Sequence, residues 1–379
     1  MEKVRIGVVG TGGIGQIHLG YLKEIERVEL TCACDNRQAV VNAVAKQHGV
    51  RAFTDPNELI GADLCDAVLI ATPHFLHPPI AIAAMKAGLH VLTEKPMAVR
   101  TSDADEMVAA AQKHRVKLAV MFQQRTDPRW KKAKTVIASG ALGELRRTCM
   151  MESYFRTQAY YDSGGWRGTW AGEGGGVLLN QAPHGIDCFL WLGGMPGAVL
   201  GRTATQAHKV EVEDLAMALL SYPNGAVGTF YVSTNEFPQV SLFQFAGDRA
   251  VLEIRGGVLR LGTSAPPAGE MLKYSKDPWD IPMDVWAEID VPSEPHGHRS
   301  ITSNFVRAIL DGEPLIAPGE EALRSLELAN AITVSSALVK EAKLPLERKL
   351  FDDLLQTRIR TSKAAKKQKT PDRVVIPRR

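Results

Sequence analysis

The chain has 379 residues, 45% of them hydrophobic, and a formal net charge of +3 at pH 7. This length predicts about two domains, each with its own core. No apolar run approaches the ~18 residues of a membrane helix and the N-terminus shows no cleavable signal pattern, so we expect a cytoplasmic protein without membrane spans.

Charge and cysteine are unevenly distributed. Residues 356–379 contain nine Lys or Arg and one acid, which leaves −5 on the rest of the chain. Such a basic end can bind nucleic acid or anionic lipid, but it is more often a solvated tail, so we expect no nucleic-acid partner. The five cysteines form neither an even set nor a C-x-x-C pair, which indicates a reducing compartment.

The first 125 residues alternate short apolar runs with segments of helical period. The runs span residues 4–9, 29–35, 67–71, 90–93 and 118–122. This alternation predicts an α/β domain with a doubly wound parallel sheet. Between the last two runs, Ser102-Asp103-Ala104-Asp105 predicts a capped helix start.

A glycine-rich loop directly follows the first run. It reads Gly10-Thr11-Gly12-Gly13-Ile14-Gly15 and opens a helical segment, the context in which G-x-G-x-x-G binds a dinucleotide. The first glycine permits the tight turn, Gly12 lets the backbone approach a pyrophosphate, and Gly15 lets helix and strand pack closely. The helix N-terminus attracts the anion. We therefore expect Gly10, Gly12, Gly13 and Ile14 to bind a cofactor.

Asp35 ends the second run, about 20 residues beyond the loop. A carboxylate there accepts hydrogen bonds from a ribose 2′-hydroxyl and repels a 2′-phosphate, so NAD is predicted over NADP. Arg37 leaves NADP possible, because its guanidinium can bind a phosphate. The alternative for Asp35 is a helix N-cap.

Two further strand ends carry polar residues at the edge where open α/β sheets bind their ligands. Ala71-Thr72-Pro73 precedes His74 and His77, and Glu94-Lys95-Pro96 ends the run 90–93. No carboxylate or thiol set accompanies the two histidines, so no metal site is predicted. Ala71, Thr72, Pro73 and His77 are expected to contact the cofactor. We expect Lys95, at this ligand-binding edge of the sheet, to take part in catalysis.

From about residue 143 the chain changes to longer strand-like stretches, at residues 144–155, 215–222, 226–233, 240–247 and 250–254. Pro223-Asn224-Gly225 predicts a hairpin with a type I′ turn, and hence an antiparallel sheet. Six of the 21 prolines lie in residues 264–298, which predicts an irregular excursion. Residues 318–343 are predicted to return to helix.

A second group of polar residues lies in Gly172-Glu173-Gly174-Gly175-Gly176 and the segment that follows, which contains Asn180 and His184. On a helix these two would share a face, as residues i and i+4. Pro183 would kink a helix interior, so they share a face only if the helix starts near Asn180. A lone histidine in such a segment is more often structural.

Together G-T-G-G-I-G, A-T-P with His77, E-K-P and G-G-G-V-L-L-N-Q-A-P-H-G-I-D resemble the Gfo/Idh/MocA family of glucose-fructose oxidoreductase, inositol dehydrogenase and rhizopine-catabolism proteins. The resemblance covers about residues 1–355. It implies a Rossmann domain at 1–125, an α+β domain with a large, mostly antiparallel open sheet at 126–355, and a basic tail at 356–379. It also implies NAD(P)-linked oxidation of sugars or polyols and a homo-oligomer, a dimer or tetramer.

The resemblance assigns roles to single residues. Lys95 matches the catalytic lysine and His184 the active-site histidine, while Asn180 stands where many members have Asp. An amide cannot ionise, so Asn180 can orient a hydroxyl but cannot accept its proton. The resemblance also implies cofactor contacts from Glu94, Lys95, Gln123, Trp166 and Arg167, and substrate contacts from Lys95, Arg125, Arg167, Asn180 and His184. The alternative for Trp166 is packing against the sheet.

The expected reaction is oxidation of a secondary hydroxyl of a cyclic sugar, glycoside, anhydrosugar or inositol to a ketone. Either Lys95 is the base while His184 and Asn180 hold the substrate, or the roles of Lys95 and His184 are reversed. Six aromatic residues could stack on a sugar face: Tyr154, Phe155, Tyr160, Tyr161, Trp166 and Trp170. The alternatives are a glycosidase that uses NAD for transient oxidation and elimination, and a non-catalytic NAD-binding sensor.

Overall fold

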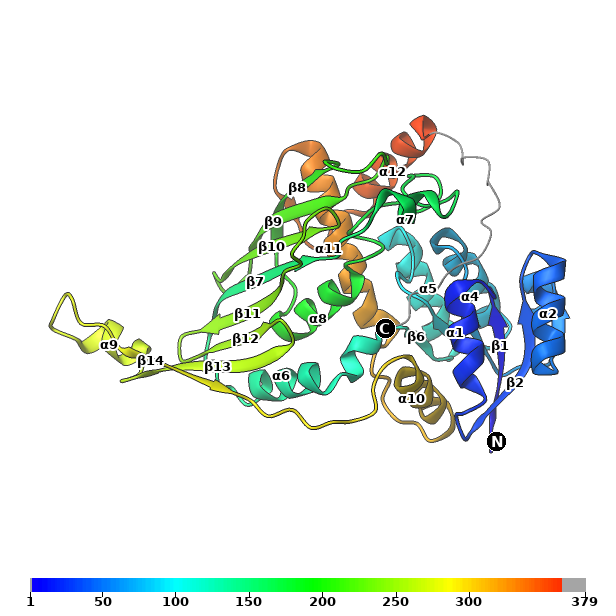
Figure 1. Cartoon of the computed structure of the whole chain (residues 1–379), viewed down its shortest axis with the longest axis horizontal. Helices are drawn as coiled ribbons and strands as arrows, with labels where there is room; N and C mark the ends of the chain where they lie inside the picture. Colours follow the sequence, from blue (N-terminus) through cyan, green and yellow to red (C-terminus); the bar gives the residue numbers. More distant parts are fainter. Residues whose placement is uncertain (1, 363–379) are drawn as a thin grey trace.

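The computed structural model describes residues 2–362 and contains two sheets, each with its own helices (Figure 1). A six-stranded sheet built from the N-terminal part of the chain lies beside a nine-stranded sheet built from the rest. This arrangement confirms the predicted combination of an α/β and an α+β fold.

The N-terminal sheet is parallel throughout, with the strand order β3-β2-β1-β4-β5-β6. Its central strands are buried on both sides, which explains why β4 is entirely apolar and β1 has a single charged residue, Arg5. The strand order reverses between β1 and β4, the point at which such sheets bind their ligands. The strands are β1 (Val4–Val9), β2 (Val28–Cys34), β3 (Arg51–Phe53), β4 (Ala67–Ile70), β5 (His90–Thr93) and β6 (Leu118–Val120).

Five helices belong to this sheet: α1 (Gly13–Leu22), α2 (Gln38–His48), α3 (Pro56–Ile60), α4 (His77–Lys86) and α5 (Thr101–His114). The predicted cap of α5 is wrong, because the helix begins at Thr101 and the amide of Thr101 donates to the distant side chain of Asn330 at 3.1 Å. The hydroxyl of Ser102 instead donates to Asp352, 3.0 Å away, on the last described helix.

The second sheet has the strand order β14-β13-β12-β11-β7-β10-β9-β8-β15. Only β7 and β10 pair in parallel, and the other neighbours are antiparallel, as the sequence predicts. The strands are β7 (Leu145–Ser153), β8 (Ala198–Ala204), β9 (Leu215–Ser221), β10 (Val227–Ser233), β11 (Ser241–Gly247), β12 (Val251–Arg255), β13 (Val258–Ala265), β14 (Met283–Glu288) and β15 (Ala342–Lys343).

The hairpin between β9 and β10 is confirmed, but its predicted turn type is wrong. Gly225, with φ of 84°, is the only residue of the turn with a positive φ, whereas a type I′ turn needs two. Pro223 holds its own φ negative, so the turn combines Pro223-Asn224 with one left-handed glycine. The amide of Gly225 donates to the carbonyl of Tyr222 at 3.0 Å.

Residues 264–298 are more regular than their prolines predict. They contain α9 (Ala268–Tyr274) and β14, which pairs with β13 over six residues of each strand. The hairpin projects far from the body of the molecule (Figure 1). Its large apolar residues are exposed, among them Leu272 at 88% and Trp279 at 85%.

The remaining helices are α6 (Pro128–Ala138), α7 (Gln158–Asp162), α8 (Pro183–Gly193), α10 (His298–Leu310), α11 (Gly319–Leu338) and α12 (Arg348–Thr361). Of these, α10 packs against α1, β1 and β5 of the first sheet. The predicted helix after Pro318 is α11, which packs along β8. The predicted basic tail overlaps α12 as far as Thr361, and its remainder lies outside the described residues. Within residues 2–362, no helix is both long and apolar enough to cross a bilayer.

The outer face of the second sheet exposes apolar side chains. Met217 and Leu219 alternate along β9 with buried residues and are 49% and 58% exposed. Association of copies into a dimer or tetramer stays a prediction.

Candidate active site

Residues predicted to bind a cofactor gather at one edge of the parallel sheet. Gly10, Asp35, Thr72, Lys95 and Gln123 all follow the carboxyl ends of strands, namely β1, β2, β4, β5 and β6. The sheet order therefore brings together side chains that are up to 113 residues apart.

The glycine loop has room for a ligand where the motif requires it. A Cβ on Gly10 would lie 2.6 Å from the carbonyl oxygen of Ala71, and one on Gly15 would lie 2.1 Å from that of Gly10. A Cβ on Gly12 or Gly13 would meet no atom within 4 Å. Gly10 and Gly15 therefore permit tight packing, whereas Gly12 and Gly13 leave the N-terminus of α1 open to a pyrophosphate.

Asp35 is buried and holds the loop in place. One carboxylate oxygen accepts from the amide and hydroxyl of Thr11 at 3.1 and 3.0 Å, and the other accepts from Arg37 Nε at 3.0 Å. Burial raises the pKa of Asp35, but the hydrogen bonds from Arg37 and Thr11 outweigh it, so the net shift is downward. The carboxylate is therefore charged, as a site that rejects a 2′-phosphate requires.

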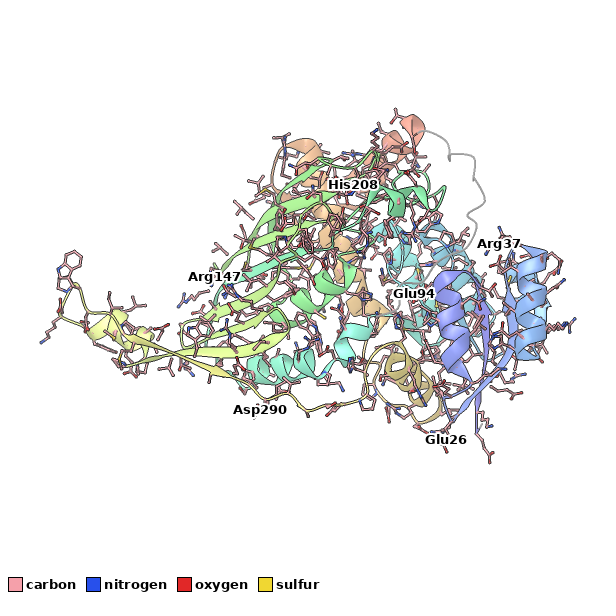
Figure 2. All side chains as sticks on the ribbon, in the orientation of Figure 1. Glu26, Arg37, Glu94, Arg147, His208 and Asp290 are labelled. Carbon is pink, nitrogen blue, oxygen red and sulfur yellow. The ribbon has the colours of Figure 1, made fainter. Side chains whose placement is uncertain are left out.

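The partner of Asp35 is free to move. Arg37 precedes the first turn of α2, and its side chain is 61% exposed (Figure 2). A ribose hydroxyl can replace the guanidinium on Asp35 without leaving a buried cation unpaired.

We expect Asp35→Asn to reduce the preference for NAD over NADP by about tenfold or more, because repulsion of the 2′-phosphate is lost while the shape of the side chain is kept. Steady-state kcat/KM with each cofactor measures this ratio. Arg37→Ala is the matched control and should use NADP less well than wild type. An unchanged ratio in Asp35→Asn would contradict the assignment.

Two histidines pack beneath the Ala71-Thr72-Pro73 loop. The two ring nitrogens of His77 contact the carbonyls of Pro96 at 2.8 Å and Thr72 at 2.7 Å, so this fully buried ring ties the loop after β4 to the loop after β5. His74 contacts the carbonyl of Glu173 at 3.1 Å. Both rings are thus held by backbone carbonyls, which gives His77 a structural place beside the cofactor loop.

Glu94 lies beside α1 in the interior (Figure 2) and is paired with a histidine that the sequence did not single out. His18 Nε2 contacts the Glu94 carboxylate at 2.8 Å, and His18 Nδ1 contacts the hydroxyl of Tyr21. Burial raises the pKa of Glu94, but the bond from His18 and the charges of His18 and Lys95 prevail and lower the pKa to about 2. Glu94 therefore carries its negative charge next to Lys95.

Lys95 reaches across from the first domain to the second. Its ammonium donates to the main-chain carbonyl of Asn180 at 2.8 Å. Burial lowers the pKa of Lys95 below its ordinary 10.5, Glu94 opposes this, and Arg167 adds to it. A larger fraction of Lys95 is therefore a free amine near neutral pH, as a general base requires.

Asn180 lies in a turn before α8 rather than on the helix. The helix starts at Pro183, a position that a proline tolerates, so the predicted shared helix face of Asn180 and His184 is absent. The Asn180 side-chain amide donates to the buried carboxylate of Glu173, and its oxygen accepts from Tyr160 at 3.4 Å. Its side chain is oriented by these two neighbours.

His184 sits in the first turn of α8, next to the lysine. The side-chain amide of Gln123 lies 3.4 Å from His184 Nε2 and donates to it, so the proton of the neutral ring is on Nδ1. Burial and then the charge of Lys95 lower the pKa of His184 to about 3. The ring is therefore neutral at physiological pH and presents a donor.

The site contains a concentration of polar atoms without partners. Among residues 2–362, seven buried side-chain nitrogen or oxygen atoms have no hydrogen bond, and four of them belong to Thr72, Gln123, Gln181 and His184. Each such atom costs about 1–3 kcal/mol unless something satisfies it. A bound cofactor and substrate would satisfy them, so the residues fit the predicted ligands.

The depressed pKa of His184 has a consequence for stability. An unfolded histidine takes up a proton below about pH 6.5, whereas folded His184 stays neutral down to about pH 3, so acidification through this window favours the unfolded state. We expect wild type to lose about 1 kcal/mol or more of unfolding free energy between pH 7 and pH 5 relative to His184→Asn. Urea unfolding at the two pH values measures this difference. Equal losses in both proteins would contradict it.

Arg125 does not lie with the other candidates. Its side chain is 3% exposed and forms two bonds of 2.7 Å to Asp187 of α8, together with a bond to Glu321 of α11. Burial lowers the pKa of Arg125, but the two acids prevail and raise it overall. The guanidinium joins the turn after β6 to α8 and α11, and a contact of Arg125 with the substrate stays a prediction.

Trp166 and Arg167 pack against each other and against His74 and Tyr160. The Trp166 ring contacts His74 edge to face at 5.5 Å, and the Arg167 guanidinium stacks on Trp166 at 4.4 Å and on Tyr160 at 4.5 Å. Of the six aromatic residues proposed to stack on a sugar, Tyr161 and Trp170 are only 5% and 6% exposed. These two rings are buried within the second domain, and the stacking of aromatic residues on a sugar stays a prediction.

Sequence reasoning missed His18 and gave no role to Glu173. Tyr160, which it proposed to stack on a sugar, also bonds to Asn180 and Arg167. The acid within the run Gly172-Glu173-Gly174 was a visible signal, because a lone carboxylate in a glycine stretch has few local partners. Nothing in the sequence marks His18 as the partner of Glu94, 76 residues away.

Two family descriptions match the chain. Residues 4–122 match "Oxidoreductase family, NAD-binding Rossmann fold", and residues 130–253 match "GFO/IDH/MocA C-terminal domain". The matched segments contain Lys95 and His184, one in each.

Similar proteins include dehydrogenases with sugar or polyol names. Myo-inositol 2-dehydrogenase of Thermotoga maritima is 30% identical over 59% of this chain and 67% of its own length. Rhizopine catabolism protein MocA of Rhizobium meliloti is 29% identical over 88% of this chain and 95% of its own. The WlbA dehydrogenase of Bordetella pertussis, solved with NADH and UDP-GlcNAcA, is 30% identical with a TM-score of 0.77 over 91% of this chain and all of that one.

The glycine loop, the charged Asp35 and the lysine after β5 agree with these matches. The chain belongs to the Gfo/Idh/MocA family and is an NAD-binding oxidoreductase that acts on CH–OH groups.

Proposed function

We propose that this enzyme oxidises a secondary hydroxyl of a cyclic sugar, glycoside, anhydrosugar or inositol to a ketone. Support for a sugar or polyol ring comes from the relatives, an inositol dehydrogenase and a dehydrogenase solved with a nucleotide sugar. Bound NAD supplies an acceptor for the hydride of the carbinol carbon.

Lys95 is the proposed base. It removes the hydroxyl proton, and the carbonyl of Asn180, 2.8 Å from Nζ, accepts a hydrogen bond from the ammonium that results. The lowered pKa of Lys95 favours this assignment over the reverse one, because His184, with a pKa of about 3, is a weak base. Without a base near neutrality, hydride loss from an alcohol is slow.

His184 and Asn180 are proposed to hold the substrate. The unpaired Nδ1 of His184 donates to the oxygen that becomes negatively charged as the proton leaves. Asn180 orients a neighbouring hydroxyl with its side chain, which Glu173 and Tyr160 hold in place. Gln123 sets the ring of His184 through Nε2.

The observation that carries the proposal is the meeting of Lys95, from the first domain, with the turn that precedes His184 in the second. The charge of Lys95 is close enough to depress the pKa of that histidine. A sensor without catalysis has no need for a buried lysine with a lowered pKa beside a neutral imidazole.

A panel of monosaccharides, glycosides, anhydrosugars, inositols and nucleotide sugars, assayed with NAD for the absorbance of NADH, tests the function. We expect NADH formation with at least one ring polyol, accompanied by an equal amount of ketone. Glycoside cleavage without net NADH would establish the glycosidase alternative instead, and tight NAD binding without turnover of any compound would overturn the proposal.

A further inference from the structure

The side of the site next to Asn180 carries an excess of positive charge. Arg156 and Arg167 are both half-buried, and both lie close enough to Lys95 for their charges to act on it. Two guanidiniums therefore lie near the base proposed for the reaction.

One tyrosine holds both guanidiniums. The ring of Tyr160 lies 4.5 Å from the Arg167 guanidinium carbon and 5.2 Å from that of Arg156. The Tyr160 hydroxyl also accepts from Arg167 Nη1 at 2.6 Å and from Gln181 at 3.1 Å. Stacking on a ring fixes a guanidinium plane, so the two arginines are pre-oriented rather than loose surface cations.

The acids of the site that the structure describes make no hydrogen bond to these arginines, although Glu173 lies close enough for the charge of Arg167 to act on it. Glu94 is paired with His18, and the two oxygens of Glu173 accept from the Gly168 amide and from Asn180. Among the described residues, the hydrogen bonds of the two guanidiniums go to Tyr160 and to the carbonyl of Phe155, and none goes to a carboxylate. Each guanidinium has five N–H donors, so most of these remain available.

We propose that Arg156 and Arg167 form a recognition site for an anionic group on the sugar, so that the preferred substrate carries a carboxylate or a phosphate. A planar guanidinium binds either group with two parallel hydrogen bonds, and these charge-assisted bonds are about twice as strong as neutral ones. A neutral sugar would leave the guanidinium N–H groups without a charged hydrogen-bond partner. This inference rests on the proposed function, because it names the substrate class of the same site.

Matched pairs of ligands test the inference on the intact enzyme. UDP-GlcNAcA against UDP-GlcNAc and glucuronate against glucose isolate the carboxylate, and glucose 6-phosphate against glucose isolates the phosphate. We expect at least one anionic member to exceed its less charged partner by about tenfold or more in kcat/KM, and the pair that responds identifies the source of the charge.

Variants locate the effect. Arg156→Ala and Arg167→Ala should each lower kcat/KM for the anionic sugar about 10- to 100-fold, with less than about a threefold change for the matched partner. Lys209→Ala removes an exposed cation from the segment that contacts Gln158 of the same loop, and it should leave both values unchanged. Equal losses for both members of a pair would overturn the inference and assign the arginines to the cofactor or the fold.

Binding separates this inference from the proposed function. Calorimetric titration of the NADH-loaded enzyme with the same compounds needs no turnover. Binding of an anionic sugar that depends on Arg156 and Arg167, without oxidation, would retain the anion site and refute the dehydrogenase. Oxidation of sugars with no preference for an anionic member would do the reverse.

Discussion

Lys95→Ala should lower kcat by about 10²-fold or more while leaving the Kd for NADH nearly unchanged. The expected size follows from general-base catalysis, which contributes roughly 10²- to 10⁴-fold. Burial lowers the pKa of Lys95 below its ordinary value, and the bond of Lys95 to the carbonyl of Asn180 orients the amine. Stopped-flow or steady-state rates with the best substrate of the panel measure kcat, and NADH fluorescence measures binding.

Two further variants make this result specific. Lys95→Arg keeps the positive charge but cannot give up its proton, so it should be as slow as Lys95→Ala if the lysine is the base, and partly active if it is an electrostatic clamp. Lys86→Ala, at an exposed position of α4, is the matched control and should behave as wild type. Full turnover in Lys95→Ala would end the proposal.

Arg125→Met should lower the free energy of unfolding by about 3–5 kcal/mol, the usual cost of leaving one member of a buried ion pair alone. Asp187 is 2% exposed and would lose both bonds of 2.7 Å to the guanidinium. Burial already holds the pKa of Asp187 above its ordinary value, and Arg125 opposes that rise, so removal of the arginine raises the pKa further. Urea unfolding at pH 7 measures the loss.

The double variant Arg125→Met/Asp187→Leu provides the control for this result. It removes both buried charges and should recover most of the stability, since apolar residues of similar size often replace a buried ion pair at little cost. Wild-type stability in Arg125→Met, combined with a raised KM for the sugar, would restore the substrate role that the sequence suggested.

The parts of the fold that were predictable depend on neighbours in sequence. Buried parallel strands such as β4 consist almost entirely of apolar residues, and the glycine loop, Asp35 and Lys95 each follow such a run. A tight hairpin at Asn224-Gly225 is equally local. Strand β8 was missed because Gly201 and Arg202 interrupt its apolar pattern, and it is recognisable only from its packing against α11.

The site was less predictable where its contacts are distant in sequence. An arginine after a strand of a Rossmann sheet suggests a ligand contact, but the partners of Arg125 lie 62 and 196 residues further on. The pairing of His18 with Glu94 is hidden in the same way. The prediction of a type I′ turn was wrong for a local reason, because Pro223 cannot adopt the positive φ that the first central position of that turn needs.

The amide at position 180 also constrains what evolution or design can do at this site. Glu173 is 1% exposed, and the side chain of Asn180 donates to it. The aspartate that family resemblance suggests for position 180, which is half-buried, would set a second carboxylate against the buried one of Glu173, and the two like charges would repel. In chains with this architecture, substitutions at positions 173 and 180 should therefore occur together, so that an acid at one position always faces a hydrogen-bond donor at the other.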